Sequence, residues 1–244
     1  MRGVRRERLV PELAGVIRTG EGLMIARLPP VDRDQLVAMR RDLHAHPELG
    51  FEERRTSTLV TERLRALGYE VRTGVGKTGV VALKGGTGRC VMLRADMDAL
   101  PVEEANDVTY RSQHAGKMHA CGHDGHVAMG LEVARRLAGL DLPGAVKFAF
   151  QPAEELSFGA DAMIQDGVLD HPSVDAAFGI HLWNDLPTGK IGLMPGAVMA
   201  SVDEFEIAIL GTGGHAAAPH QTTDPVLVAA HLVTGLQSLV SRRR

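Results

Sequence analysis

Short apolar runs that alternate with helical patterns are the feature that most constrains the fold of this chain. Continuous apolar runs, unlike runs broken by polar residues, suit strands that helices cover on both faces. Apolar residues recur at helical spacing over 36–43, 60–67 and 127–137. This alternation predicts an α/β domain with a largely parallel sheet flanked by helices. The expected strands are GVVAL at 79–83, CVML at 90–93, VKFAF at 146–150 and AAFGI at 176–180.

The pattern changes near residue 200. In VDEFEIAIL, at 202–210, apolar residues alternate with others, which predicts a half-buried strand. Asp224 and Pro225 predict the N-cap and first position of a following helix, and Asp124 is the expected N-cap of the helix over 127–137. The chain ends at SRRR directly after the later helix. One strand and one helix cannot bury each other adequately, so we expect this second unit to be incomplete.

Charge and composition exclude several classes of protein. The 27 basic and 30 acidic residues give a net charge of -3, which favours neither nucleic acid nor an anionic membrane as partner. No apolar run approaches the roughly 20 residues of a membrane-spanning helix. Two cysteines make no disulfide scaffold, so a cytoplasmic location is expected, with Cys90 as a buried, inert thiol. The Arg-rich segment at residues 1–8 predicts a solvated extension rather than a transit peptide.

Two polar clusters lie near the end of the second expected strand and before the helix at 127–137. In RADMDALP, at 94–101, two interpretations of Asp96 and Asp98 remain open. They either bind metal or orient a ligand, or they are part of a polar turn that ends at Pro101. In MHACGHDGH, at 118–126, four metal-capable side chains lie beside two glycines that let the backbone bend. Thiolate and imidazole suit zinc and its neighbours, so this cluster predicts a metal site. The four side chains are those of His119, Cys121, His123 and His126.

Two further clusters follow the other expected strands. In FQPAEE, at 150–155, Glu154 and Glu155 come directly after a buried strand. One carboxylate can then bind metal while the other takes a proton from water, although neighbouring glutamates are often only solvated. In GIHLW, at 179–183, His181 ends the last strand. A single histidine at a strand end is usually structural, but the other three clusters favour a functional role.

Other metal and nucleophile chemistries lack their signatures. No H-E-x-x-H helix, C-x-x-C pair, G-x-S-x-G elbow or P-loop pattern occurs. Cys121 is an alternative nucleophile, paired with His119 or His123. A cysteine protease, however, has no obvious use for the glutamate pair and His181.

Six motifs, in their order along the chain, resemble the two-metal aminoacylase/hippurate hydrolase family. This branch holds bacterial N-acyl-amino-acid amidohydrolases and plant auxin-conjugate hydrolases. The resemblance runs from about Gln35 to Ser241. The motifs are RRDLHAHPELGFEE, RADMDALP, MHACGHDGH, FQPAEE, GIHLW and GTGGHAAAPH.

The resemblance implies a role for each candidate site residue. Cys121 would bridge two divalent ions, which are Zn, Mn, Co or Ni. His123 and His181 would ligate one ion and Glu155 the other. Glu154 would be the general base. Asp96 and Asp98 would stand behind the ligands, with Asp98 orienting one of them, and His44 and His46 would be structural.

The resemblance also implies three regions and an assembly. Residues 1–30 would be an extension, 31–199 the metal-binding catalytic domain, and 200–244 the start of an inserted ferredoxin-like lid, here incomplete. Two lids would pair in a homodimer, and His215 would reach a partner's site to stabilise the oxyanion, with His220 contacting substrate. Relatives have a further metal-binding histidine that no residue here matches.

The leading hypothesis is therefore a metal-dependent amidohydrolase that cleaves N-acyl amino acids such as hippurate. A dipeptidase or carboxypeptidase of the same fold is the nearest alternative. A hypothesis from another class is a truncated chain that binds metal or dimerises without turning over substrate.

Overall fold

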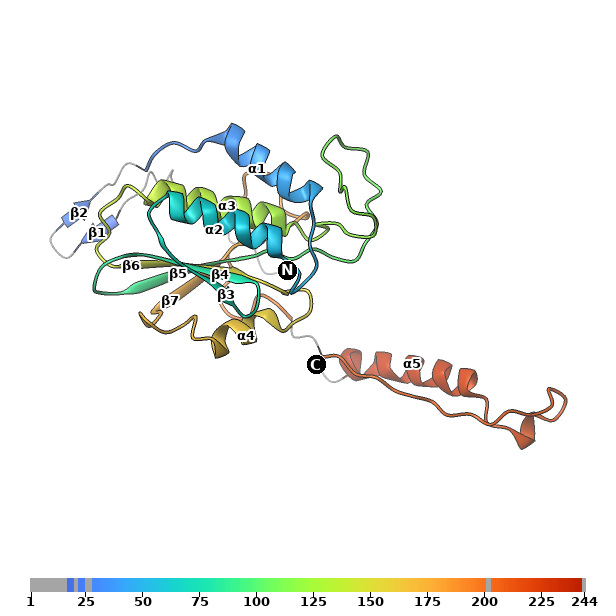
Figure 1. Cartoon of the computed structure of the whole chain (residues 1–244). Coiled ribbons are helices and arrows are strands. Elements are labelled where there is room, and N and C mark those ends of the chain that lie inside the picture. Colours follow the sequence, from blue (N-terminus) through green and yellow to red (C-terminus); the bar gives the residue numbers. More distant parts are fainter. Residues whose placement is uncertain (1–16, 20–21, 25–27, 201–202, 243–244) are drawn as a thin grey trace, which may run out of the picture. The chain divides into compact units, whose positions relative to one another are not determined.

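The computed structural model describes residues 17–19, 22–24, 28–200 and 203–242 (Figure 1). The chain divides into two units, Met1–Asp185 and Leu186–Arg244. Most of the extension expected over 1–30, including the Arg-rich segment, lies outside the described residues. Its described part contains the antiparallel pair β1 (Ile17–Thr19) and β2 (Gly22–Met24). The domain roles expected for 31–199 and 200–244 stay predictions.

The first unit contains a five-stranded sheet with the strand order β3-β4-β6-β5-β7. β5 runs parallel to β6 and β7, whereas β4 runs antiparallel to β3 and β6. The α/β class is confirmed, and the sheet is mixed because the tight turn between β3 and β4 allows only an antiparallel pair. The strands are β3 (Glu70–Val75), β4 (Gly79–Gly85), β5 (Cys90–Asp96), β6 (Ala145–Gln151) and β7 (Ala176–Gly179).

Helices cover both faces of this sheet (Figure 1). On one face lie α1 (Arg33–Ala45), α2 (Arg54–Ala66) and α3 (His123–Leu137), and on the other lies the short α4 (Gly159–Gln165). Alternate strand residues face the two layers, so Phe148 and Phe150 belong to the larger core and Ala149 to the smaller one. Cys90 is buried at the start of β5, as expected, and burial raises the pKa of its thiol.

The second unit differs from the sequence-based expectation. No strand forms over the described residues 203–210, and Phe205 is 68% exposed, so the predicted half-buried strand is wrong. A strand needs a neighbour, and the described part of this unit offers only an isolated bridge between Thr212 and Thr223. The later elements are η1 (Pro219–Gln221) and α5 (Pro225–Arg242).

The start of α5 follows the prediction. Asp224 accepts hydrogen bonds from the backbone N–H groups of Val226 at 2.9 Å and Leu227 at 3.3 Å, so its side chain caps the helix. Among the described residues, no helix is both long enough and apolar enough to cross a membrane.

Candidate metal centre

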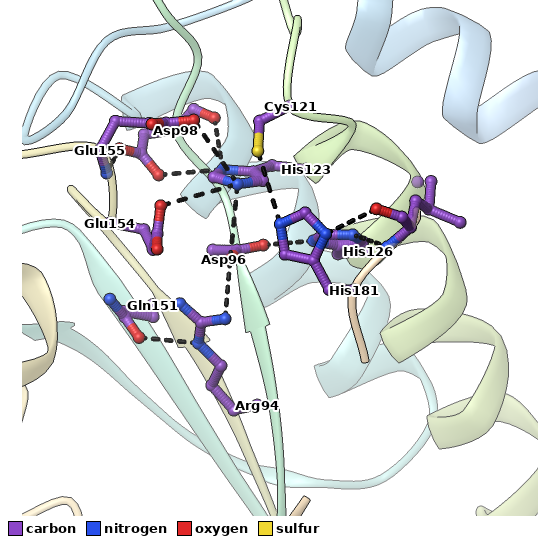
Figure 2. Close-up of polar contacts among 12 residues, drawn as sticks. Arg94, Asp96, Asp98, Cys121, His123, His126, Gln151, Glu154, Glu155 and His181 are labelled. Atoms are coloured by element: carbon purple, nitrogen blue, oxygen red, sulfur yellow. Dashed lines mark hydrogen bonds and ion pairs between the residues drawn. The ribbon is translucent and has the colours of Figure 1, made fainter. Parts of the chain in front are cut away.

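The candidate centre lies at one edge of the sheet, where β5, β6 and β7 all end. Parallel strands end at the same edge, so segments that are far apart in the sequence meet there. Asp96 ends β5, Glu154 and Glu155 follow β6, and His181 follows β7. The fourth segment is the start of α3, which carries His123. Figure 2 shows these side chains pointing toward one another.

Cys121, His123 and His181 form the first group of candidate ligands. One ligand atom from each lies within 4.8 Å of the others, and Cys121 Sγ is 3.4 Å from His181 Nε2 (Figure 2). His181 Nδ1 lies 2.6 Å from the carbonyl oxygen of Leu182, and His123 Nδ1 lies 2.9 Å from that of Asp98. In each neutral ring, Nδ1 then carries the proton and Nε2 is free to bind a cation.

The two glutamates complete the cluster. Glu154 Oε2 and Glu155 Oε1 each lie 3.8 Å from His123 Nε2. His123 Nε2 and Glu155 Oε1 are buried and have no hydrogen-bond partner among the described residues. Burying such atoms without a partner is costly, and a divalent cation would satisfy both. The sulfur, nitrogen and oxygen donors also suit zinc and its neighbours, so these residues fit a metal site.

Charge within the cluster agrees with this interpretation. Burial, followed by the negative charge of Glu155, raises the pKa of the Cys121 thiol to about 12. Burial likewise raises the pKa of Glu155, which the nearby His123 partly offsets. A thiol with so high a pKa is a poor nucleophile by itself, which argues against the cysteine-nucleophile alternative. A bound cation would remove the main electrostatic cost of this arrangement.

Asp98 contacts two of the candidate ligands. Its Oδ1 lies 3.2 Å from His123 Nδ1, and its Oδ2 accepts a hydrogen bond from the backbone N–H of Glu155 at 2.9 Å. Burial by itself lowers the pKa of His123, but the bond to Asp98 and the surrounding carboxylates outweigh it and raise that pKa. One carboxylate therefore orients an imidazole and a glutamate together.

Asp96 stands behind the ligands in a second network. Its Oδ1 lies 2.6 Å from His126 Nδ1, and its Oδ2 lies 2.7 Å from Arg94. Burial alone would raise the pKa of Asp96, but the bond from His126 and the neighbouring positive charges lower it to about 2. His126 Nε2 accepts a hydrogen bond from the backbone N–H of Leu182 at 2.9 Å, beside His181. Both ring nitrogens of His126 thus have hydrogen-bond partners, so we interpret His126 as a residue that holds its neighbours in position and not as a metal ligand.

The remaining members of the 118–126 cluster behave differently from expectation. His119 is buried, belongs to no candidate ligand group among the described residues, and burial lowers its pKa to about 4. The prediction that Asp124 is an N-cap is wrong, because α3 begins at His123 with left-handed Gly122 at the cap position. Asp124 instead lies in the first turn, where its carboxylate contacts His44 at 2.7 Å and Arg40 at 2.9 Å.

His46 and His215, which lie outside this centre, have local hydrogen-bond partners. His46 is the C-cap residue of α1, and its Nδ1 lies 2.8 Å from the carbonyl oxygen of Asp42. In the second unit, His215 Nδ1 accepts a hydrogen bond from the backbone N–H of Ala217 at 3.1 Å, and His220 lies in η1. Both are exposed, and the roles expected for them stay predictions.

Sequence reasoning expected Asp96 and Asp98 behind the ligands but missed Arg94 and Gln151 and the pairing of His126 with Asp96. Arg94 contacts both Asp96 and Gln151, the latter at 2.8 Å from its Nε. Its position two residues before Asp96 on a strand was the available signal, since alternate residues share a face. No comparable signal in the sequence pairs His126 with Asp96, because 30 residues separate them.

Comparison with known proteins gives a consistent family. A family model described as peptidase family M20/M25/M40 matches residues 92–242. An N-acyl-L-amino acid amidohydrolase of Geobacillus stearothermophilus is 48% identical over 89% of the chain and 60% of the relative. A hippurate hydrolase of Campylobacter jejuni is 46% identical over 84% of the chain and 54% of the relative.

A solved structure from Bacillus subtilis, described as a dinuclear metal-binding peptidase of family M20, matches with a TM-score of 0.60. It is 42% identical, and the match covers 63% of this chain and 44% of that one. The chain therefore spans little more than half the length of the curated relatives it matches.

Proposed function

Because this chain belongs to the M20/M25/M40 peptidase family, we propose that it serves as a metal-dependent amidohydrolase that cleaves N-acyl amino acids. The observation that carries the proposal is the convergence of a thiol, two imidazole Nε2 atoms and two glutamates at one sheet edge. The similarity to an N-acyl-L-amino acid amidohydrolase and a hippurate hydrolase supports this substrate class.

Four side chains would hold two divalent ions. Cys121 would lie between the ions, His123 and His181 would bind one, and Glu155 would bind the other. Bound ions of this kind act as Lewis acids that polarise a carbonyl group and make water a stronger acid. Asp98 would keep His123 and Glu155 in place, and Asp96 would fix His126 behind His181.

Glu154 is the proposed general base. It is the one member of the glutamate pair whose backbone N–H is not held by Asp98, and its side chain is the more exposed at 38%. An accessible carboxylate beside the ligands can take a proton from the attacking water and return it to the leaving amine. A carboxylate that binds metal is a weaker base, because the charge of the cation lowers its affinity for a proton, and this is the reason for dividing the roles.

Residues of the second unit would complete the site in an assembly. We propose that His215 of a second copy stabilises the negative charge that develops on the substrate carbonyl oxygen, and that His220 contacts substrate. A homodimer through the second unit, a cytoplasmic location and a choice among Zn, Mn, Co and Ni belong to the same proposal. The resemblance of GTGGHAAAPH to the family motif supports the first part.

Removal of the base tests the proposal. Glu154→Ala is expected to lower kcat for hippurate by roughly 10²–10⁴-fold, the usual contribution of general base catalysis, while metal content stays near that of the wild type. Glu62→Ala, on the exposed face of α2, is the matched control and should leave both unchanged. Normal turnover in Glu154→Ala would rule out the assignment.

Two alternatives have distinct outcomes. The similarity to a solved dinuclear metal-binding peptidase favours a peptidase of the same fold as the second candidate. Cleavage of dipeptides in preference to hippurate would select that candidate. Stoichiometric metal binding without hydrolysis of either substrate would select a non-catalytic metal-binding chain.

A further inference from the structure

Glu53 is a fully buried carboxyl group at the start of α2, outside the cluster of candidate ligands. Its side chain is 0% exposed, and none of the basic side chains that the structure describes forms an ion pair with it. Its Oε1 accepts a hydrogen bond from the backbone N–H of Ala153 at 2.8 Å, and its Oε2 accepts one from the Thr78 hydroxyl group. Burial raises the pKa of Glu53, and these bonds only partly offset that effect. Burying a carboxyl group without a positively charged partner costs free energy, so we expect Glu53 to have a specific role.

The partner of Glu53 has an unusual backbone conformation. Ala153 is buried and has a φ of 47°, in the left-handed region that residues with a Cβ atom seldom adopt. It lies between the end of β6 and Glu154. The bend at this residue therefore sets the direction in which the chain leaves the sheet, and it brings Glu154 and Glu155 toward His123.

Neighbouring groups hold the bend on each side. The carbonyl oxygen of Ala153 accepts a hydrogen bond from the backbone N–H of Gly159 at 3.2 Å. A Cβ atom at Gly159 would lie only 1.6 Å from the carbonyl oxygen of Pro152, so only glycine allows this approach. Asp98 holds the N–H of Glu155. Glu53 and Asp98 thus fix the backbone on either side of Glu154.

We propose that Glu53 is a positioning residue for Glu154, because its carboxylate keeps Ala153 in the left-handed conformation that directs Glu154 toward the cluster. The inference rests on the proposed function, in which Glu154 is the general base. The side-chain hydrogen bonds of Glu53 go to Ala153 and Thr78, and Glu53 belongs to no candidate ligand group among the described residues. Its effect should therefore fall on the turnover step and on the Ala153 backbone rather than on metal binding.

Two substitutions at Glu53 distinguish the role of its hydrogen-bond acceptor oxygen from the role of its negative charge. In Glu53→Ala the Ala153 N–H loses its partner, and kcat for hippurate should fall by roughly 10²-fold, as for an angstrom-scale misplacement of a catalytic group. KM and metal content should stay within about twofold of wild type. Glu53→Gln keeps an acceptor oxygen for Ala153 while the Thr78 hydroxyl group can accept from the new amide, so kcat should stay within about threefold of wild type.

A backbone change provides a rescue test. Glycine adopts positive φ without the steric cost that alanine carries, so Ala153→Gly should depend less on Glu53. The double variant Glu53→Ala/Ala153→Gly should recover at least about tenfold of the lost kcat. Glu52→Ala is the matched control, because Glu52 is the adjacent glutamate but is exposed and pairs with Lys117 at 3.1 Å. It should have no effect on kcat.

Hydrogen exchange at the Ala153 amide tests, independently of activity, whether Glu53 holds the backbone of Ala153 in place. In Glu53→Ala this amide should exchange at least about tenfold faster than in wild type, and in Glu53→Gln it should not. If the wild type hydrolyses no hippurate, the proposed function fails while this measurement still tests the positioning claim. Wild-type turnover and slow exchange in Glu53→Ala would overturn the inference. If Glu53→Ala does not fold, a loss of kcat near 10²-fold in Glu53→Gln would overturn it instead.

Discussion

At the residue scale, the candidate ligands are held in place by side chains that are not ligands themselves. Asp98 contacts both His123 and the backbone of Glu155, while Asp96 fixes His126 beside His181. A ligand with a fixed orientation loses little freedom when it binds a cation, so these contacts contribute to affinity.

Asp98→Ala should weaken binding of Zn²⁺ or Mn²⁺ by about 10- to 100-fold, the usual effect of losing a group that orients metal ligands. The physical cause is the release of the His123 ring and of the Glu155 backbone at once. Titration of the metal-free protein, followed by calorimetry, measures the change. Asp107→Ala, at an exposed position in the loop after β5, is the control. An unchanged affinity in Asp98→Ala would show that Asp98 does not orient the ligands.

At the scale of elements, a buried ionic network joins α1 to the start of α3. His44, in the last turn of α1, lies 2.7 Å from Asp124 Oδ2 and 3.1 Å from Glu104 Oε1. Arg40 also contacts Asp124, and the ring of Tyr110 packs edge-on against His44. Since α3 begins with His123, this network stabilises the helix end that carries a candidate ligand.

The network predicts a pH dependence of stability. The hydrogen bond to Asp124 is the largest effect on His44 and raises its pKa above the usual value, despite burial and the repulsion from Arg40. Protonated His44 therefore stabilises the fold, and this stabilisation is complete at a pH below the pKa of His44 in the unfolded chain, which is about 6.5. It is lost as the pH rises through the higher pKa of His44 in the folded chain.

The free energy of unfolding of wild type should therefore exceed that of His44→Gln most strongly near about pH 6, where Asp124 and Glu104 are still ionised. The difference should shrink toward about pH 9, where neutral His44 keeps its hydrogen bonds but loses its charge. Urea unfolding at the two pH values measures it. A difference that grows with pH would show that the network holds a neutral histidine.

Elements predicted from the sequence succeed or fail for physical reasons. Continuous apolar runs gave β4, β5, β6 and β7. Burial on both faces accounts for this pattern in β4 and β6, whereas all four residues of β7 are exposed. The edge strand β3 was missed because most of its residues are exposed and it has no such run. The seven residues of α4 are too few for a clear period. The strand expected at 202–210 failed because alternation describes a strand's faces but does not supply its partner.

The site was predictable to the extent that strand ends determine it. The positions of the polar clusters at strand and helix ends predicted a metal site, and the family resemblance selected Cys121, His123, Glu155 and His181 within them. The structure brings these four residues together. Asp124 was misassigned because capping preference is local, whereas its carboxylate is bound by two residues of α1 that lie about 80 positions earlier. Contacts of such sequence separation follow from the packed fold and not from the motif.

At the scale of the whole molecule, the centre gathers more negative than positive groups at the edge of the sheet. The high pKa of Cys121 and the raised pKa of Glu155 both follow from that crowding and from burial. A divalent cation that binds the folded chain and not the unfolded one would stabilise it, by about 2.7 kcal/mol at a free concentration 100 times Kd. Metal binding is thus the common premise of the proposed reaction and of the fold around it.

The metal-to-protein ratio, measured by elemental analysis after dialysis against Zn²⁺ or Mn²⁺ and then buffer, tests that premise most directly. We expect one or two divalent ions per wild-type chain and almost none in a Cys121→Ala/His181→Ala variant that keeps its circular dichroism spectrum. If the wild-type chain retains no more metal than this variant, these residues do not form a metal centre.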